Sequence, residues 1–315
     1  MIQQEDWQGV PIYTVSNDVL SFSLCPSINN NLFRVWDKKL NREVLRVPES
    51  PQTLKDAPVH YGTPILFPPN RIRRGAFEYD GRNYQFPINT ANENHIHGLI
   101  GHLPWQVTNI SEESDHLSIT STFRTEDFPE VLKHYPNALT LEVTYELRGT
   151  SLIHTLKATN NSSTKAPFGY GLHTWFLLDH APQNWTFELP VSGVWELDKE
   201  LIPNGTILPL GRFEELSEGI SLENQDLDTV FQIGDHERLA VLKQEGCEVR
   251  YSASDIFKHW VIYTKGQADN YICLEPYTWV TDAPNSELDP SITGLTGVEP
   301  GETLELEIKL DIVHT

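Results

Sequence analysis

The stretch LTLEVTYELRGTSLIHTLKATN (139–160) decides the fold class. Apolar and polar residues alternate through both of its halves, and a period of two is typical of a β-strand that buries one face. Gly149 lies in a turn between the halves, so they are predicted to pair as an antiparallel hairpin. The apolar face of the first half consists of Leu139, Leu141, Val143, Tyr145 and Leu147.

The same alternation recurs along the rest of the chain. TLELEIKLDIV (303–313) aligns five apolar residues with charged residues between them. Weaker strand patterns occupy 20–24, 117–123, 185–189, 239–244, 260–264 and 271–275. Turns are predicted at Asp80-Gly81, Asn204-Gly205, Glu245-Gly246, Lys265-Gly266 and Pro300-Gly301. Helical periodicity is nearly absent, and only 126–138 is expected to hold a short helix.

These patterns predict an all-β protein built as one large antiparallel β-sandwich. The chain has 315 residues, and all-β folds of this length often form a single unit. The sequence contains neither a linker nor a repeat of fixed period that would divide it. We therefore expect a single domain over residues 1–315.

The charge balance excludes several classes of partner. The chain carries 44 acidic and 23 basic side chains, a formal net charge of −21. A nucleic-acid binder needs a basic surface, and so does a protein that docks on anionic lipid. The start of the chain has no basic, apolar leader, and its apolar runs fall short of the roughly 18 residues that span a bilayer. The three cysteines lack CxxC spacing and are expected to be free buried thiols, which predicts a cytoplasmic location. The sequence does not indicate the oligomeric state.

Candidate binding residues appear first in Asn70-Arg71-Ile72-Arg73-Arg74, which follows a Pro-rich apolar segment. An arginine planted at the end of an apolar strand presents a rigid fork of donors to hydroxyls or anions. Arg71, with its neighbour Asn70, is therefore a candidate substrate contact. Arg73 and Arg74 are equally well explained as surface residues of a turn.

A second candidate segment is HIHGLIGHLPW (95–105). If it is extended, His95 and His97 share a face, which raises the possibility of metal ligation. The segment has no cysteine or carboxylate to complete such a site, so no metal is predicted. The glycine that follows His97 instead suggests a tight turn of the backbone.

Two further segments carry residues of catalytic type. His173 lies close to Trp175 and Phe176, aromatic residues that could stack on a sugar ring or belong to the core. Glu275 ends an apolar strand and precedes Pro276, where a pocket can open. A carboxyl group half-buried at such a place has a raised pKa, which suits a general base.

The four segments lack the motifs of several large enzyme classes. The chain has no phosphate-binding glycine loop of the P-loop or Rossmann kind and no GxSxG nucleophile elbow. Histidines, one glutamate, one arginine and flanking aromatics suit acid–base chemistry on a small polar organic molecule. No cofactor is expected.

In their order along the chain, these segments resemble the aldose 1-epimerase (galactose mutarotase) family. The resemblance covers roughly residues 60–285. Its matching elements are GTPILFPPNRI (62–72), His97-Gly98 with Gly101 and Trp105, PFGYGLHTWF (167–176), Leu227-Asp228 before Phe231, and CLEPYT (273–278) with Asn285.

The resemblance implies a galactose mutarotase-like supersandwich that interconverts the α and β anomers of a free aldose such as galactose or glucose. His173 matches the general acid that protonates the ring oxygen, and Glu275 matches the general base that takes the anomeric proton. His97 and Arg71 match substrate-binding positions. Asp228 matches the carboxylate that accepts hydrogen bonds from sugar hydroxyls. No metal or organic cofactor is implied.

The sequence departs from the galactose mutarotase pattern at two places, Leu172 before the acid and Leu99 after His97-Gly98. Three alternatives therefore stay open: a hexose-phosphate mutarotase, suggested by Arg71, Arg73 and Arg74, a non-catalytic carbohydrate-binding or sensing protein, and a glycoside-cleaving enzyme. The charge of −21 repels anionic sugars on approach and so modestly favours a neutral substrate.

Overall fold

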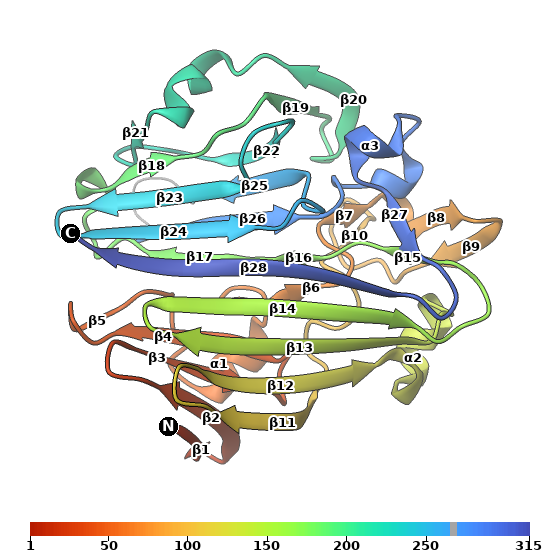
Figure 1. The fold of residues 1–315 in the computed structure, drawn as a ribbon. Coiled ribbons are helices and arrows are strands. Elements are labelled where there is room, and N and C mark those ends of the chain that lie inside the picture. Colours follow the sequence, from red (N-terminus) through yellow and green to blue (C-terminus); the bar gives the residue numbers. More distant parts are fainter. Residues whose placement is uncertain (265–269) are drawn as a thin grey trace.

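A nine-stranded antiparallel sheet forms one face of the molecule in the computed structural model, which describes residues 1–264 and 270–315 (Figure 1). The predicted hairpin lies within this sheet, as β13 and β14, and β28 pairs with β14 along nine residues. In spatial order the strands are β11 (Gln106–Glu112), β12 (Leu117–Arg124), β13 (Leu139–Arg148), β14 (Ser151–Asn160), β28 (Thr303–His314), β24 (Cys247–Ala253), β23 (Leu239–Gln244), β18 (Thr186–Glu188) and β21 (Ile220–Ser221).

Two further sheets lie behind this one in Figure 1. The eight-stranded sheet consists of β20 (Pro203–Leu208), β19 (Gly193–Leu197), β22 (Asp228–Gln232), β25 (His259–Tyr263), β26 (Tyr271–Tyr277), β16 (Gly171–Leu172) and β6 (Ile65–Leu66), with β17 (Thr174–Leu177) also paired to β26. The five-stranded sheet is a meander of β1 (Ile2–Trp7), β2 (Val10–Ser16), β3 (Leu20–Cys25), β4 (Asn31–Asp37) and β5 (Arg42–Glu43). The predicted all-β antiparallel sandwich is confirmed.

Short elements complete the fold. Three two-stranded ribbons pair β7 (Arg71–Ile72) with β10 (His95–Ile96), β8 (Ala76–Tyr79) with β9 (Arg82–Gln85), and β15 (Ala166–Phe168) with β27 (Thr296–Val298). The α-helices are α1 (Pro51–Asp56), α2 (Pro129–His134) and α3 (Pro290–Thr293). None of the helices in the described part of the chain is long and apolar enough to cross a membrane.

The helix predicted within 126–138 is present as α2, but the expectation of little other helix is too strict. Helices α1 and α3 are missed because each is shorter than the three turns needed for a visible 3.6-residue period. Both begin at a proline preceded by a capping residue, Ser50 or Asp289, and this start signal is readable from sequence.

Most predicted turns are found between the expected strands, but the turn at Asn204-Gly205 is wrong. These two residues lie inside β20, and the chain reverses earlier, where the backbone N–H of Asp198 donates to Ile202 (2.9 Å). The turn predicted at Lys265-Gly266 lies outside the described residues.

The core forms from the alternating residues that the sequence pattern identifies. Val143, Leu156 and Leu306 occupy one row across β13, β14 and β28, and all three are buried. The charged residues between them face solvent, as the pattern predicts. All three cysteines are free and buried, as expected.

One row of the eight-stranded sheet positions the candidate site. Val230 of β22 pairs with Val261 of β25, which pairs with Glu275 of β26. Residues opposite one another in antiparallel strands point to the same face of a sheet. Glu275 therefore projects from the same face as the two valines, with Val261 directly beside it.

Candidate active site

Glu275 and His173 form a buried pair at the centre of the site. His173 lies between β16 and β17, and its Nε2 atom is 3.3 Å from Oε1 of Glu275. The side chain of Glu275 is 3% exposed and that of His173 is 9% exposed. Tyr277, two residues along β26 and so on the same face, donates its hydroxyl to Oε2 of Glu275. One oxygen of the carboxylate is therefore fixed by Tyr277, while the other faces the imidazole.

Trp175 holds the imidazole of His173 in place. The two rings stack with centroids 4.9 Å apart and planes 8° apart. The indole Nε1 donates to the carbonyl of Val59 (2.8 Å), and Trp175 is only 2% exposed. Phe176 belongs to the core, which is the alternative left open for one of these two aromatics. With so little of the indole accessible, Trp175 orients the histidine and has little surface left for a sugar ring.

Arg71 and Asn70 enter the site from the β7–β10 ribbon. The Oδ1 atom of Asn70 accepts from the backbone N–H of Arg71 (2.8 Å) and from its guanidinium (3.1 Å). Asn70 adopts a left-handed conformation with φ of +54°, a region that asparagine tolerates better than most residues. This turn aims the guanidinium of Arg71 back toward the sheet.

His97 follows β10 and leaves the strand direction with φ of +64°. The segment is therefore not extended there, and His95 and His97 do not share a face. Nδ1 of His95 bonds to the carbonyl of Pro87 (2.7 Å), whereas the ring of His97 meets that of His173 edge-on at 5.5 Å. Within residues 1–264 and 270–315, no group of three or more His, Cys, Asp or Glu side chains is placed to hold a metal ion.

Gly98 fixes the position of His97, because no larger residue fits there. Its φ is +73°, and a Cβ atom at this position would lie 2.1 Å from the carbonyl oxygen of Phe67. The suspected tight turn is therefore a close approach between two backbone segments, and the N–H of Leu99 donates to that same carbonyl (3.0 Å).

We expect Gly98→Ala to destabilise the fold by more than about 2 kcal/mol, because it combines backbone strain with a clash against backbone atoms. Urea unfolding measures this change. Gly301→Ala is the matched control, since Gly301 has a similar φ of +79° but nothing within 4 Å of its Cβ position. A loss at Gly98 no larger than that at Gly301 would contradict the assigned close contact.

The structure brings all seven predicted site residues to one cavity of about 490 Å³, in the size range of small-molecule sites. Asp228, the first residue of β22, is exposed, so the cavity is open on that side. The lining residues are Arg46, Val59, His60, Asn70, Arg71, Ile96, His97, His173, Trp175, Asp228, Val261, Tyr263, Tyr271 and Glu275.

Burial sets the protonation of the central pair. It raises the pKa of Glu275 to about 8, with the carboxylate of Asp228 adding to the rise and Tyr277 and Arg71 opposing it. Burial, together with His97 and His60, lowers the pKa of His173 well below its usual value. At neutral pH the pair therefore holds one proton, because Glu275 retains its proton while His173 does not take up a second.

Comparison with known proteins identifies the family. The sequence profile described as "Aldose 1-epimerase" matches residues 32–311. The chain belongs to the aldose 1-epimerase family.

Solved and curated relatives agree with this family. The fold of this aldose 1-epimerase family member resembles the crystal structure of a galactose mutarotase-like protein from Clostridium acetobutylicum, with a TM-score of 0.94. The two sequences are 26% identical, and the match covers 100% of this chain and 99% of that one. It is 30% identical to the uncharacterized protein YihR of Escherichia coli K12 over 162 residues, 50% of this chain and 49% of YihR. It is 27% identical to rat galactose mutarotase over 158 residues, 48% of this chain and 43% of that protein. These two sequence matches span about half the length of each curated relative.

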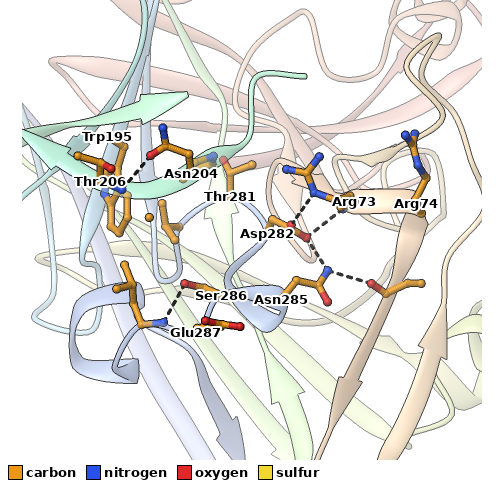
Figure 2. Close-up of a pocket in the computed structure, with 15 residues that line it drawn as sticks. Arg73, Arg74, Trp195, Asn204, Thr206, Thr281, Asp282, Asn285, Ser286 and Glu287 are labelled. Carbon is orange, nitrogen blue, oxygen red and sulfur yellow. Dashed lines mark hydrogen bonds and ion pairs between the residues drawn. The ribbon is translucent and has the colours of Figure 1, made fainter. Parts of the chain in front are cut away.

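Arg73 and Arg74 of this epimerase-family member lie outside the site. Arg73 pairs with Asp198 (2.6 Å), Glu200 (3.1 Å) and Asp282 (3.9 Å), and Arg74 with Glu200 (3.4 Å). Figure 2 shows them in a separate pocket, with Arg73 directed to Asp282. The three arginines that suggested a phosphate site therefore do not form one cluster, and the carboxylates largely offset the charges of Arg73 and Arg74.

Sequence reasoning missed other residues of the epimerase-family cavity, notably Arg46, His60 and Tyr271. Nothing near Arg46 in the sequence distinguishes it from a surface arginine. Tyr277, by contrast, was accessible to prediction, because strand alternation places it on the same face as Glu275.

Proposed function

We propose that this protein is an aldose 1-epimerase that interconverts the α and β anomers of an aldose by opening and closing the sugar ring. One observation carries the proposal: the pair of His173 and Glu275, 3.3 Å apart, is buried in the wall of an open cavity. Mutarotation needs one group that accepts a proton and one that donates a proton at the same ring edge.

In the proposed mechanism, the proton that the pair shares first passes from Glu275 to His173, whose Nε2 atom lies 3.3 Å from the carboxyl oxygen. Glu275 then takes the proton from the O1 hydroxyl as His173 gives one to the ring oxygen O5. The C1–O5 bond breaks and O1 becomes the carbonyl oxygen of an open-chain aldehyde. Rotation about C1–C2 presents the other face of the carbonyl, and ring closure returns both protons. No electrons are transferred to or from the sugar.

The remaining residues are proposed to bind and orient the sugar. Arg71, steered by Asn70, donates to hydroxyls, and Asp228 accepts from them. His97 faces the ring of His173 and helps to polarise the ring oxygen. Its Nδ1 atom is buried and has no hydrogen-bond partner among the described residues, so a sugar oxygen would satisfy it. Trp175 keeps the acid in position through the stacked rings.

The direct test is to measure how fast α-galactose and α-glucose approach equilibrium with their β anomers, by polarimetry or ¹H NMR. We expect the purified protein to accelerate the approach at least a hundredfold over buffer at micromolar enzyme. Equilibration at the buffer rate for every common hexose and pentose would refute the proposal.

The rate should depend on pH through the proton that the central pair shares. The active pair holds one proton, so kcat/KM should be level near neutrality and fall about tenfold per unit above pH 8, where Glu275 loses that proton and none is left for O5. In acid, activity should decline only well below pH 6.5, where His173 gains a second proton. Initial rates from pH 5 to 10, corrected for the buffer reaction, measure this profile, and a kcat/KM that rises through pH 8 would contradict it.

A further inference from the structure

Arg46 lines the same cavity, on the side occupied by Trp175. Both of its backbone groups are fixed: its N–H donates to the carbonyl of Trp175 (2.9 Å) and its carbonyl accepts from Gly62 (2.9 Å). The backbone at Arg46 is therefore anchored to β17 through Trp175 and to the segment at Gly62.

Aromatic rings hold the guanidinium of Arg46. Its Cζ atom lies 4.6 Å from the ring centroid of Tyr61, 4.7 Å from that of Tyr271 and 5.1 Å from that of Trp175. One nitrogen, Nη1, donates to the carbonyl of His60 (3.1 Å). Ring faces orient a cation without cancelling its charge.

No carboxylate lies within 4.0 Å of the Arg46 guanidinium in residues 1–264 and 270–315, whereas Arg73 is paired with three. Arg71, the other arginine of the cavity, faces Asp228 and Glu275, whose protonation it influences. The guanidinium of Arg46 is thus held in place at the cavity, with no carboxylate beside it to neutralise its charge. Guanidinium forks of this kind match carboxylate and phosphate groups in geometry and charge.

The chain of contacts from the acid group indicates which part of a sugar lies near Arg46. His173 stacks on Trp175, and the Arg46 guanidinium lies over the same indole. In the proposed function His173 faces O5, and O5 of a pyranose is bonded to C5, which carries C6. The substituent on C6 is therefore the part of the sugar that extends from His173 toward Trp175 and Arg46, whereas C2 lies on the side of Glu275.

We propose that Arg46 binds an anionic group on C6 of the substrate, so that the preferred substrates are acidic aldoses, either hexuronates or hexose 6-phosphates. This inference rests on the proposed function and narrows its substrate class. The net charge of −21 slows the approach of such a sugar, but a contact at the site acts after the encounter and raises affinity locally.

The test compares anomer exchange of glucose, glucuronate and glucose 6-phosphate by ¹H NMR at pH 7 and constant ionic strength. We expect kcat/KM to be at least about tenfold higher for one of the acidic sugars than for glucose, and the identity of that sugar distinguishes carboxylate from phosphate. Arg46→Gln should lower this acidic-to-neutral ratio by about 10- to 100-fold, the size expected for a charge-assisted bidentate contact, mainly through KM.

Arg34→Gln is the matched control, because Arg34 also lies over an aromatic ring, that of Trp36, but pairs with Glu43 away from the cavity. Arg34→Gln should leave the acidic-to-neutral ratio of kcat/KM within about twofold of the wild-type ratio. Arg46→Lys, which keeps the charge and loses the fork, should give an intermediate ratio and serves if Arg46→Gln fails to fold.

Each result has a definite meaning. Exchange of glucose at least as fast as that of both acidic sugars, or a ratio unchanged by Arg46→Gln, overturns the role of Arg46 while the proposed epimerase activity stands. Failure to accelerate exchange of any of the three sugars overturns the proposed function itself.

Discussion

Replacing Glu275 by glutamine is expected to lower kcat for anomer interconversion by about a thousandfold, the largest effect of any single substitution in this chain. General bases contribute about 10²- to 10⁴-fold to such reactions, and glutamine cannot accept the O1 proton. The KM should change little, because glutamine has nearly the shape of glutamate and still accepts a hydrogen bond from Tyr277. Anomer exchange measured by NMR at saturating sugar gives kcat directly.

The same substitution should make the protein more stable at neutral pH. The pKa of Glu275 is raised to about 8 in the fold, so the carboxyl group begins to destabilise the protein above its unfolded pKa near 4.5, and the loss grows until pH 8. Glutamine has no charge to bury, so this destabilisation disappears. We expect the free energy of unfolding to rise by about 1–3 kcal/mol at pH 7 and to stay unchanged at pH 4. An inactive variant with raised stability rules out misfolding as the cause, whereas retention of more than a tenth of kcat would contradict the role of Glu275 as base.

His173→Asn is expected to lower kcat by about 10²- to 10³-fold, because the group that gives a proton to O5 is lost. Asparagine occupies part of the imidazole volume and keeps a polar group opposite Glu275, so the fold should persist. Stopped-flow polarimetry with α-glucose measures the change in kcat.

The double variant with Glu275→Gln and His173→Asn distinguishes a joint action from two separate ones. The effects of two groups that move protons in concert do not add. The kcat of the double variant should therefore lie no more than about threefold below the kcat of the less active single variant. Losses that multiply would mean that the two residues act in independent steps. The Phe176→Leu variant, altered beside the site in the core, provides a comparison for nonspecific disturbance, and its kcat should stay within a few-fold of wild type.

Strand alternation predicted most of this fold, because a period of two survives wherever a strand has one buried face. The segments at 139–147, 151–160 and 303–313 lie in adjacent strands, with the expected residues inside. The order of the strands was not predictable, since alternation says which face is buried but not which neighbour covers an edge. Gly205 suggested a turn, but it lies within β20 where the pairing with β19 shifts register, and its φ of +94° suits such an irregularity of an edge strand.

For the site, residue type and family resemblance identified the participants, and only the folded chain shows their arrangement. Arg71 and Glu275 are about two hundred positions apart, and no local pattern indicates that they meet at one cavity. Arg46 escaped prediction for the same reason, because its significance comes from aromatic rings contributed by distant segments. The shared proton of the central pair likewise depends on burial that the sequence does not show.

The placement of β28 has a consequence for how the chain folds during synthesis. This strand follows all the others in the chain, yet it lies in the middle of the large sheet, between β14 and β24. Its contacts with β14 join residues as far apart as Ser151 and Asp311. Until the ribosome has made this strand, two unpaired sheet edges stay exposed, which invites association between nascent chains. Pairing over such separations is slow, so we expect a late, slow folding step in which one strand closes the sheet and buries both edges together.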